Sequence, residues 1–111
     1  MAMNNRQIEQ IAQIFRAMGD ATRLKILLAL HDKELNVTEL CRKLRMPQPT
    51  VSHHLGLLRL NGLVVNRRSG KVRIYSIRED EPNIFGQVLR RLLQGAAAVR
   101  IGPSAGNMAE S

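Results

Sequence analysis

One short polar stretch carries side chains suited to hydrogen bonding with the edges of DNA bases. Val51, Leu55 and Leu58 recur at helical spacing, so they mark one face of a helix as apolar. The other face then presents amide, hydroxyl and imidazole groups. Gln pairs with adenine through two hydrogen bonds, Ser and Thr bond either kind of base edge, and a Thr methyl touches the thymine methyl. The residues predicted to contact bases here are Gln48, Pro49, Thr50, Ser52 and His53.

A second group of candidate residues is basic. Two Val- and Ile-rich segments, residues 63–67 and 72–77, flank a turn centred on Ser69 and Gly70, which predicts a β-hairpin. Cations near its tip suit contact with phosphates or the minor groove. Solvated charges on an ordinary hairpin are the simpler alternative, but the sign of the charge, the hairpin's position and the preceding helix all favour DNA contact. These cations are Arg67, Arg68, Lys71 and Arg73.

The charge along the chain also indicates a polyanionic partner. Between Glu39 and Glu79 there is no acidic residue, and the whole chain has 17 Lys plus Arg against 9 Asp plus Glu. Neutralising phosphates releases counterions, so such a segment gains affinity for nucleic acid before any base is contacted. The chain has no Trp and two Phe, whereas a helix that lies on a membrane surface needs aromatic side chains on its apolar face. Double-stranded DNA is therefore the expected partner, and no membrane is.

Length and composition favour one small domain. A chain of 111 residues that is 44% hydrophobic suits a single compact domain, predicted here over residues 1–101. Residues 102–111 lack periodicity and are predicted to be a disordered tail. The single Cys excludes an intramolecular disulfide, and we see neither a signal peptide nor a long apolar segment. We therefore expect a cytoplasmic protein.

Helical patterns surround the candidate residues. Residues 6–18 show one apolar stripe, and residues 23–30 are apolar nearly all round, which predicts a helix buried on most sides. Asn36 followed by Glu39 is a capping-box pattern that opens a helix of about two turns. Residues 45–47 then interrupt the helical pattern before residues 48–60 resume it. Two helices with this break form a helix-turn-helix.

After the hairpin, residues 84–100 show the pattern of a fifth helix. The predicted fold class is mainly α with a small β-hairpin: a winged helix-turn-helix of five helices and a two-stranded wing. Its DNA-binding part spans residues 36–77.

The helices near the two ends are predicted to form a homodimer. Their apolar stripes exceed what one small core helix could cover, and two copies would bury the surplus. Packing within one subunit is the alternative. The predicted interface residues are Ile8, Ile11, Phe15, Phe85, Val88, Leu89 and Leu92.

Several stretches together resemble the ArsR (arsenical-resistance repressor) family of winged-helix proteins. They are residues 18–27 (MGDATRLKIL), 39–41 (ELC), 48–58 (QPTVSHHLGLL) and 61–64 (NGLV), within a likeness that covers about residues 15–77. The resemblance implies a cytoplasmic homodimer whose first and last helices form the interface. It also implies binding to an imperfect palindrome in a promoter and blocking of transcription.

The chain departs from the metal-sensing members of that family. One branch carries a Cys-x-Cys pair at the positions of Asn36 and Thr38, and neither residue supplies a thiolate. Another branch binds zinc or nickel through Asp and His on the last helix, which here has no His and no acid after Glu81. We therefore expect no metal site and no cofactor.

The remaining thiol and imidazole groups do not suggest a site. Cys41 is interpreted as packing, because one thiol cannot chelate a metal. His53 and His54 point about 100° apart on a helix and do not converge. His54 is expected to pack or to form a local hydrogen bond.

No Gly-rich phosphate loop, activated nucleophile or catalytic carboxylate cluster is visible, so an enzyme is not predicted. The leading hypothesis is a dimeric, sequence-specific repressor that binds a palindromic promoter operator. Two alternatives stay open. One is a repressor that responds to a ligand or an oxidant through an unrecognised inducer site, with Cys41 as a target of oxidation. The other is a winged-helix protein-interaction module, which should show an exposed apolar patch in place of the polar face.

Overall fold

The structure is a computed structural model that describes residues 2–78, 91–92 and 94–95. The chain divides after Arg78 into two units, and in the first the elements follow the order α1, α2, α3, α4, β1, β2. The described residues contain four helices with defined bounds rather than the five predicted, because most of residues 84–100 lies outside them. Residues 91–92 and 94–95 of that predicted helix are helical. The predicted tail, residues 102–111, also lies outside the described residues.

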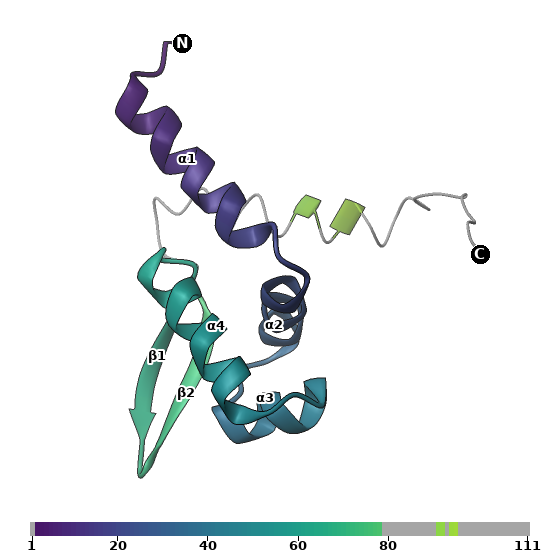
Figure 1. Ribbon diagram of the computed structural model, residues 1–111. Helices are drawn as coiled ribbons and strands as arrows, with labels where there is room; N and C mark the ends of the chain where they lie inside the picture. Colours follow the sequence, from purple (N-terminus) through teal and green to yellow (C-terminus); the bar gives the residue numbers. More distant parts are fainter. Residues whose placement is uncertain (1, 79–90, 93, 96–111) are drawn as a thin grey trace, which may run out of the picture. The chain divides into compact units, whose positions relative to one another are not determined.

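The four helices begin and end within two residues of the predicted bounds. They are α1 (Asn5–Met18), α2 (Ala21–Asp32), α3 (Val37–Leu44) and α4 (Gln48–Leu60). Figure 1 shows α2, α3 and α4 packed together, the hairpin beside α4, and α1 leading away from this group. No helix of the described residues is long and apolar enough to cross a membrane.

Side-chain caps fix where the helices begin. The Asn36 side chain accepts a hydrogen bond from the Glu39 backbone N–H at 2.8 Å, and Glu39 accepts one from the Asn36 N–H at 2.8 Å, as the capping-box pattern predicted. Asp20 caps α2 by accepting from the Arg23 N–H at 3.0 Å. Such caps satisfy backbone groups that the helix itself leaves without partners.

The core lies where α2, α3, α4 and the base of the hairpin meet. The predicted inward residues of α4 are buried, with exposed fractions of 1% or less. One expectation was wrong: α2 is not buried on most sides, because Leu24 and Leu28 are exposed. These leucines lie four residues apart, on one helical face. The fully buried large side chains are Ile26, Leu27, Leu40, Leu55, Leu58, Leu63, Val51 and Val64.

The turn between α3 and α4 contains a left-handed residue that was not predicted from the sequence. Arg45 has φ 55° and ψ 48°, a left-handed conformation that usually favours glycine. The Met46 N–H then donates to the Cys41 carbonyl at 3.1 Å, which closes α3. Arg45 is also exposed, so its guanidinium stands at the entrance to α4.

The wing is an antiparallel pair, β1 (Val64–Ser69) and β2 (Val72–Ile77). The predicted turn was one residue too early, because β1 continues to Ser69 and the turn is formed by Gly70 and Lys71. Gly70 has φ 63°, and a positive φ at the first turn position alone is typical of a type II′ hairpin. Leu35 also pairs with Tyr75, which ties the wing to the segment before α3.

The left-handed Arg45 provides a test of this turn. We expect Arg45→Gly to raise the free energy of unfolding by about 0.5–1 kcal/mol, because glycine adopts this conformation without a steric cost. Arg45→Ala removes the same charge and keeps the Cβ, so it is the matched control. Chemical denaturation of the two variants measures the difference, and equal stabilities would contradict a strained Arg45.

Candidate nucleic-acid interface

The predicted base-contacting residues lie together at the N-terminal end of α4. Gln48, Pro49, Ser52 and His53 are exposed, and Thr50 is half-buried. They are held there because the opposite face of the same helix, formed by Val51, Leu55 and Leu58, is packed into the core. This end of the helix has no side-chain cap, since Pro47 occupies the N-cap position. Pro49 carries no N–H, and the N–H groups of Thr50 and Val51 both donate to the Pro47 carbonyl, at 3.1 and 3.2 Å, so the backbone at this end offers a phosphate few free donors.

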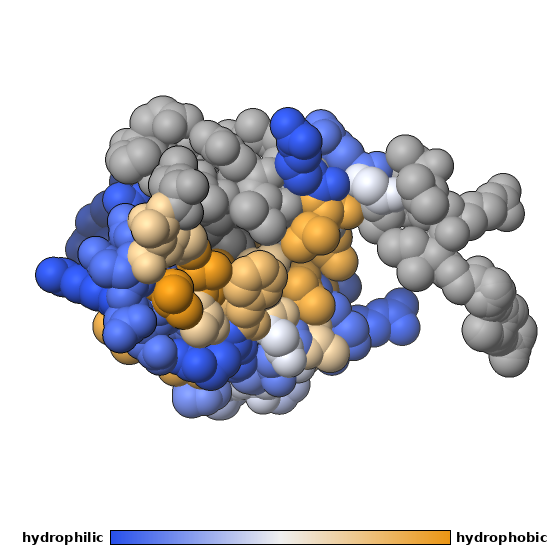
Figure 2. Space-filling model, turned by 90° about the horizontal axis from the view of Figure 1, so that it is seen from above, coloured by the Kyte–Doolittle hydropathy of each residue, from blue (hydrophilic) through white to orange (hydrophobic). Residues whose placement is uncertain are grey.

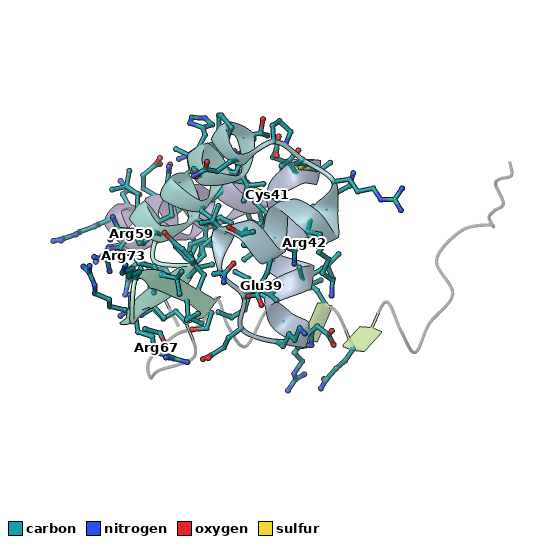
Figure 3. The ribbon with its side chains drawn as sticks, turned by 90° about the horizontal axis from the view of Figure 1, so that it is seen from below. Glu39, Cys41, Arg42, Arg59, Arg67 and Arg73 are labelled. Carbon is teal, nitrogen blue, oxygen red and sulfur yellow. The ribbon has the colours of Figure 1, made fainter. Side chains whose placement is uncertain are left out.

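The four wing cations do not form one cluster. Paired residues point to the same face of an antiparallel ladder, so Arg68 and Arg73, which pair directly, share a face. Arg67 points to the opposite face and forms a 2.8 Å ion pair with Glu34. Figure 3 shows Arg67 and Arg73 on opposite sides of the hairpin. Lys71 lies in the turn itself, so the predicted group divides into three cations near the tip and one that is already paired.

The Arg68–Arg73 pair places two positive charges side by side. Like charges directly opposite each other destabilise a hairpin unless another group compensates them. Arg73 donates to the Asn66 side-chain oxygen at 3.0 Å, and Arg68 donates to the Gly70 carbonyl at 3.3 Å. Neither acceptor is charged. Both guanidinium groups are exposed and available to a phosphate.

The carboxylates of the first unit have partners elsewhere. Within residues 2–78, Glu9 pairs with Arg16, Asp32 with Lys43, and Glu34 with Arg67, while Asp20 and Glu39 cap helices. In that same range, no carboxylate lies within ion-pair distance of the cations around α4 and the wing tip. Those cations are Arg42, Arg45, Arg59, Arg68, Lys71 and Arg73. The carboxylates of residues 2–78 therefore leave the charges of these cations without neutralisation.

Sequence reasoning missed a polar contact behind α4. The His54 side chain turns inward, with 18% of it exposed, and its Nδ1 lies 3.1 Å from Arg23 Nη1 and 3.9 Å from Asp20 Oδ2. His54 packs, as one of the two expectations had it, but its hydrogen-bond partner is not local, because Arg23 lies on α2. No sequence signal predicts this pairing beyond the suitability of Asp20 as a cap. Arg45 was also missed as a candidate phosphate contact, although its charge was visible.

The predicted dimer residues are partly described. Ile8, Phe15 and Leu92 are exposed and Ile11 is half-buried, whereas Phe85, Val88 and Leu89 lie outside the described residues. Phe15 is 57% exposed, which is unusual for a side chain of its size. Seen from above, apolar residues of the described part of the chain gather into a patch bordered by hydrophilic residues (Figure 2).

The two positions that were compared with a Cys-x-Cys pair in the sequence have other roles in the structure. Asn36 caps α3, and Thr38 is exposed in its first turn. Cys41 is a free thiol and half-buried. In the part of the chain that the structure describes, no three His, Cys, Asp or Glu side chains come together to hold a metal ion. The expectation that His53 and His54 do not converge was wrong as to their rings, which meet edge to face with centroids 5.2 Å apart.

The comparisons with known proteins agree with this geometry. The profile described as "Bacterial regulatory protein, arsR family" matches residues 20–65. The transcriptional activator HlyU of Vibrio cholerae is 37% identical over 79 residues, which make up 71% of this chain and 73% of HlyU. The chain belongs to the ArsR family. It is therefore a helix-turn-helix transcriptional regulator and not an enzyme.

Other members of the ArsR family show how far the likeness extends. The transcriptional regulator KmtR of Mycobacterium tuberculosis is 38% identical over 74 residues, which are 67% of this chain but 57% of KmtR. The solved structure of V. cholerae HlyU superimposes with a TM-score of 0.69 at 32% identity, covering 80% of this chain and 97% of that one. A homodimeric winged helix-turn-helix DNA-binding domain of Mb0332 from Mycobacterium bovis gives a TM-score of 0.68 at 28% identity, over 90% and 97% of the two chains.

The division of the wing cations leads to a prediction about their separate contributions. We expect Arg68→Ala and Arg73→Ala each to weaken DNA binding and to lower the slope of log affinity against log salt by about 1, because each removes an uncompensated phosphate contact. Arg67→Ala should change both quantities less, because Glu34 already neutralises Arg67. Fluorescence anisotropy titrations over a range of salt concentrations measure both. A loss at Arg67 equal to that at Arg73 would contradict the division.

Proposed function

We propose that this ArsR-family protein is a homodimeric repressor that acts in the cytoplasm and binds a palindromic operator in a promoter. The observation that carries this proposal is the juxtaposition of two surfaces. The exposed polar side chains at the start of α4 suit base edges, and the unneutralised cations of the wing tip suit phosphates. The proposed DNA contacts are Gln48, Pro49, Thr50, Ser52, His53, Arg67, Arg68, Lys71 and Arg73.

The arrangement also suits the way a helix-turn-helix docks. The second helix lies in the major groove with its N-terminal residues at the base edges, while the first helix crosses the backbone. In this assignment α4 is the recognition helix and α3 the crossing helix. The exposed face of α4 is polar at its N-terminal end, which favours DNA over a protein partner as the occupant.

A homodimer is proposed because α1 exposes large apolar side chains that a single unit leaves in water. Ile8 and Phe15 are each more than half exposed. A fifth helix over residues 84–100, carrying Phe85, Val88, Leu89 and Leu92, is proposed to complete the interface. Two recognition helices related by a twofold axis would then contact half-sites about one helical turn apart.

Repression is the proposed outcome because a dimer seated on promoter DNA excludes RNA polymerase without needing a surface that recruits it. HlyU is named an activator, so the direction of regulation has to be measured. A reporter gene behind the selected operator tests it directly: expression should fall when the protein is supplied. A rise in expression would overturn repression and leave DNA binding intact.

The contribution of Gln48 to sequence specificity can be tested at one base pair. We expect Gln48→Ala to cost about 1–3 kcal/mol of discrimination at the base that Gln48 contacts, because the bidentate pair is lost. Binding to competitor DNA should hardly change, since Gln48 carries no charge. Selection of preferred duplexes by the wild type and the variant reveals the affected position. Identical preferences in the two selections would remove Gln48 from the proposed contacts.

The dimer interface can be tested by placing a charge on its proposed apolar face. We expect Phe15→Glu to shift the protein from dimer to monomer and to weaken operator binding at least tenfold, because a buried carboxylate opposes association. Gln10→Glu adds the same charge at an exposed polar position of α1 and is the matched control. Analytical ultracentrifugation measures the association state. A Phe15→Glu protein that remains dimeric would place the interface elsewhere.

A further inference from the structure

The Arg23 side chain joins three helices at one point behind the recognition helix. Its Nε donates to the Ala17 carbonyl at 2.6 Å, and its Nη2 approaches the Arg16 carbonyl at 3.5 Å. These carbonyls belong to the last turn of α1, where the helix supplies few donors, and the Arg16 carbonyl also accepts from the Gly19 N–H at 3.2 Å. Its Nη1 is directed at His54 Nδ1 of α4, 3.1 Å away. A guanidinium fixes such directions well, because its donors lie in one rigid plane.

The Arg23–His54 hydrogen bond constrains the rotation of α4 about its own axis. Val51, Leu55 and Leu58 hold this helix through apolar burial, which is not directional. Within the described residues, the Arg23–His54 contact is the one side-chain hydrogen bond that links α4 to another helix. His54 lies on the same helical turn as Ser52 and His53. A rotation of α4 about its axis would therefore displace the His54 ring from Arg23 and also turn the proposed base-contacting residues.

We propose that Arg23 and His54 are positioning residues, which fix the angle of the recognition helix relative to the end of α1 and thereby permit tight operator binding. The inference rests on the proposed function and concerns the same DNA-binding surface. Because α1 is the proposed dimer helix, the contact would fix each recognition helix relative to the dimer interface. It would thereby set the distance between the two recognition helices of the dimer.

The hydrogen bond requires one protonation state of His54. Arg is a donor only, so His54 Nδ1 must accept, and the ring proton is assigned to Nε2. An imidazolium has no acceptor, and it would also place a second cation beside the guanidinium. Asp20 Oδ2 lies 3.9 Å from Nδ1, and the His53 ring lies beside His54 on the same helix. The Arg23 backbone N–H keeps the pKa of Asp20 low, so this carboxylate stays charged and can draw an imidazolium away from Arg23.

The test compares three variants, two at His54 and one at His31, on a duplex that the wild type has selected from a random pool. His54→Asn places an amide oxygen near the position of Nδ1 and so restores the acceptor. His54→Leu removes the acceptor and keeps an apolar body of similar size. His31→Leu makes the same change at an exposed histidine of α2 that is outside the proposed DNA contacts, so it is the matched control. The dissociation constant is measured at fixed salt and fixed pH.

We expect His54→Leu to bind the duplex about tenfold more weakly than the wild type, because it loses a hydrogen bond to a charged group. His54→Asn should restore most of the lost affinity, because its amide oxygen accepts from Arg23 in place of Nδ1. His31→Leu should bind like the wild type. Both His54 variants should remain dimeric and cooperatively folded.

Two results would overturn the inference: a folded His54→Leu protein that binds as tightly as the wild type, or a folded His54→Asn protein that binds as weakly as His54→Leu. If His54→Leu does not fold, Arg23→Met removes the donor of the same contact and should weaken binding by a similar factor, and unchanged binding would overturn the inference. Failure of the proposed function looks different, because the wild type itself would then select no duplex.

Discussion

The burial of one face of α4 is the constraint on which the rest of this small unit depends. Val51, Leu55 and Leu58 fill the space between α2, α3 and the base of the hairpin, and their exposed fractions are 1% or less. Because one face of this 13-residue helix is buried, helical geometry determines which of its residues are exposed on the opposite face. The polar residues from Gln48 to His53 are thus presented as a consequence of core packing, and α3, only two turns long, is stable because it packs against the same helix.

Charge is distributed so that the surface beside α4 stays positive. The acids of residues 2–78 cap helices or pair with cations away from the wing tip, and Arg68 faces Arg73 across the hairpin with no carboxylate nearby. Such an arrangement lowers the stability of the free protein slightly and favours a polyanion that relieves it. The left-handed Arg45 fits the same view, because a cation is kept at the entrance of α4 where glycine would be less strained.

Local signals in the sequence predicted the helices well, while contacts between distant residues were not predictable. Asn36 with Glu39 predicted the start of α3, because a capping box is formed by residues that are neighbours in the sequence. The hairpin turn shifted by one residue, since both Ser69–Gly70 and Gly70–Lys71 are acceptable turn pairs and only the strand register decides between them.

The two most informative side-chain contacts link residues more than 30 positions apart: Arg23 with His54, and Arg67 with Glu34. The charge pattern alone could not reveal that Arg67 forms an ion pair with a carboxylate, whereas Arg73 forms a hydrogen bond with the neutral Asn66 side chain. Apolar periodicity likewise marked α2 as a core helix without indicating that Leu24 and Leu28 face outward. Membership of the ArsR family supplies the regulatory role, whereas the residues proposed to contact DNA are inferred from the exposed surface of this particular chain.

The measurement that tests this account most directly is a residue-resolved NMR titration of the full chain with a duplex that it selects. Binding through the proposed surface predicts amide shift changes concentrated at residues 45–53 and 66–73, with the exposed side of α1 unchanged at constant dimer state. Changes confined to other parts of the unit, or a folded dimer whose spectrum no duplex alters at low ionic strength, would contradict it.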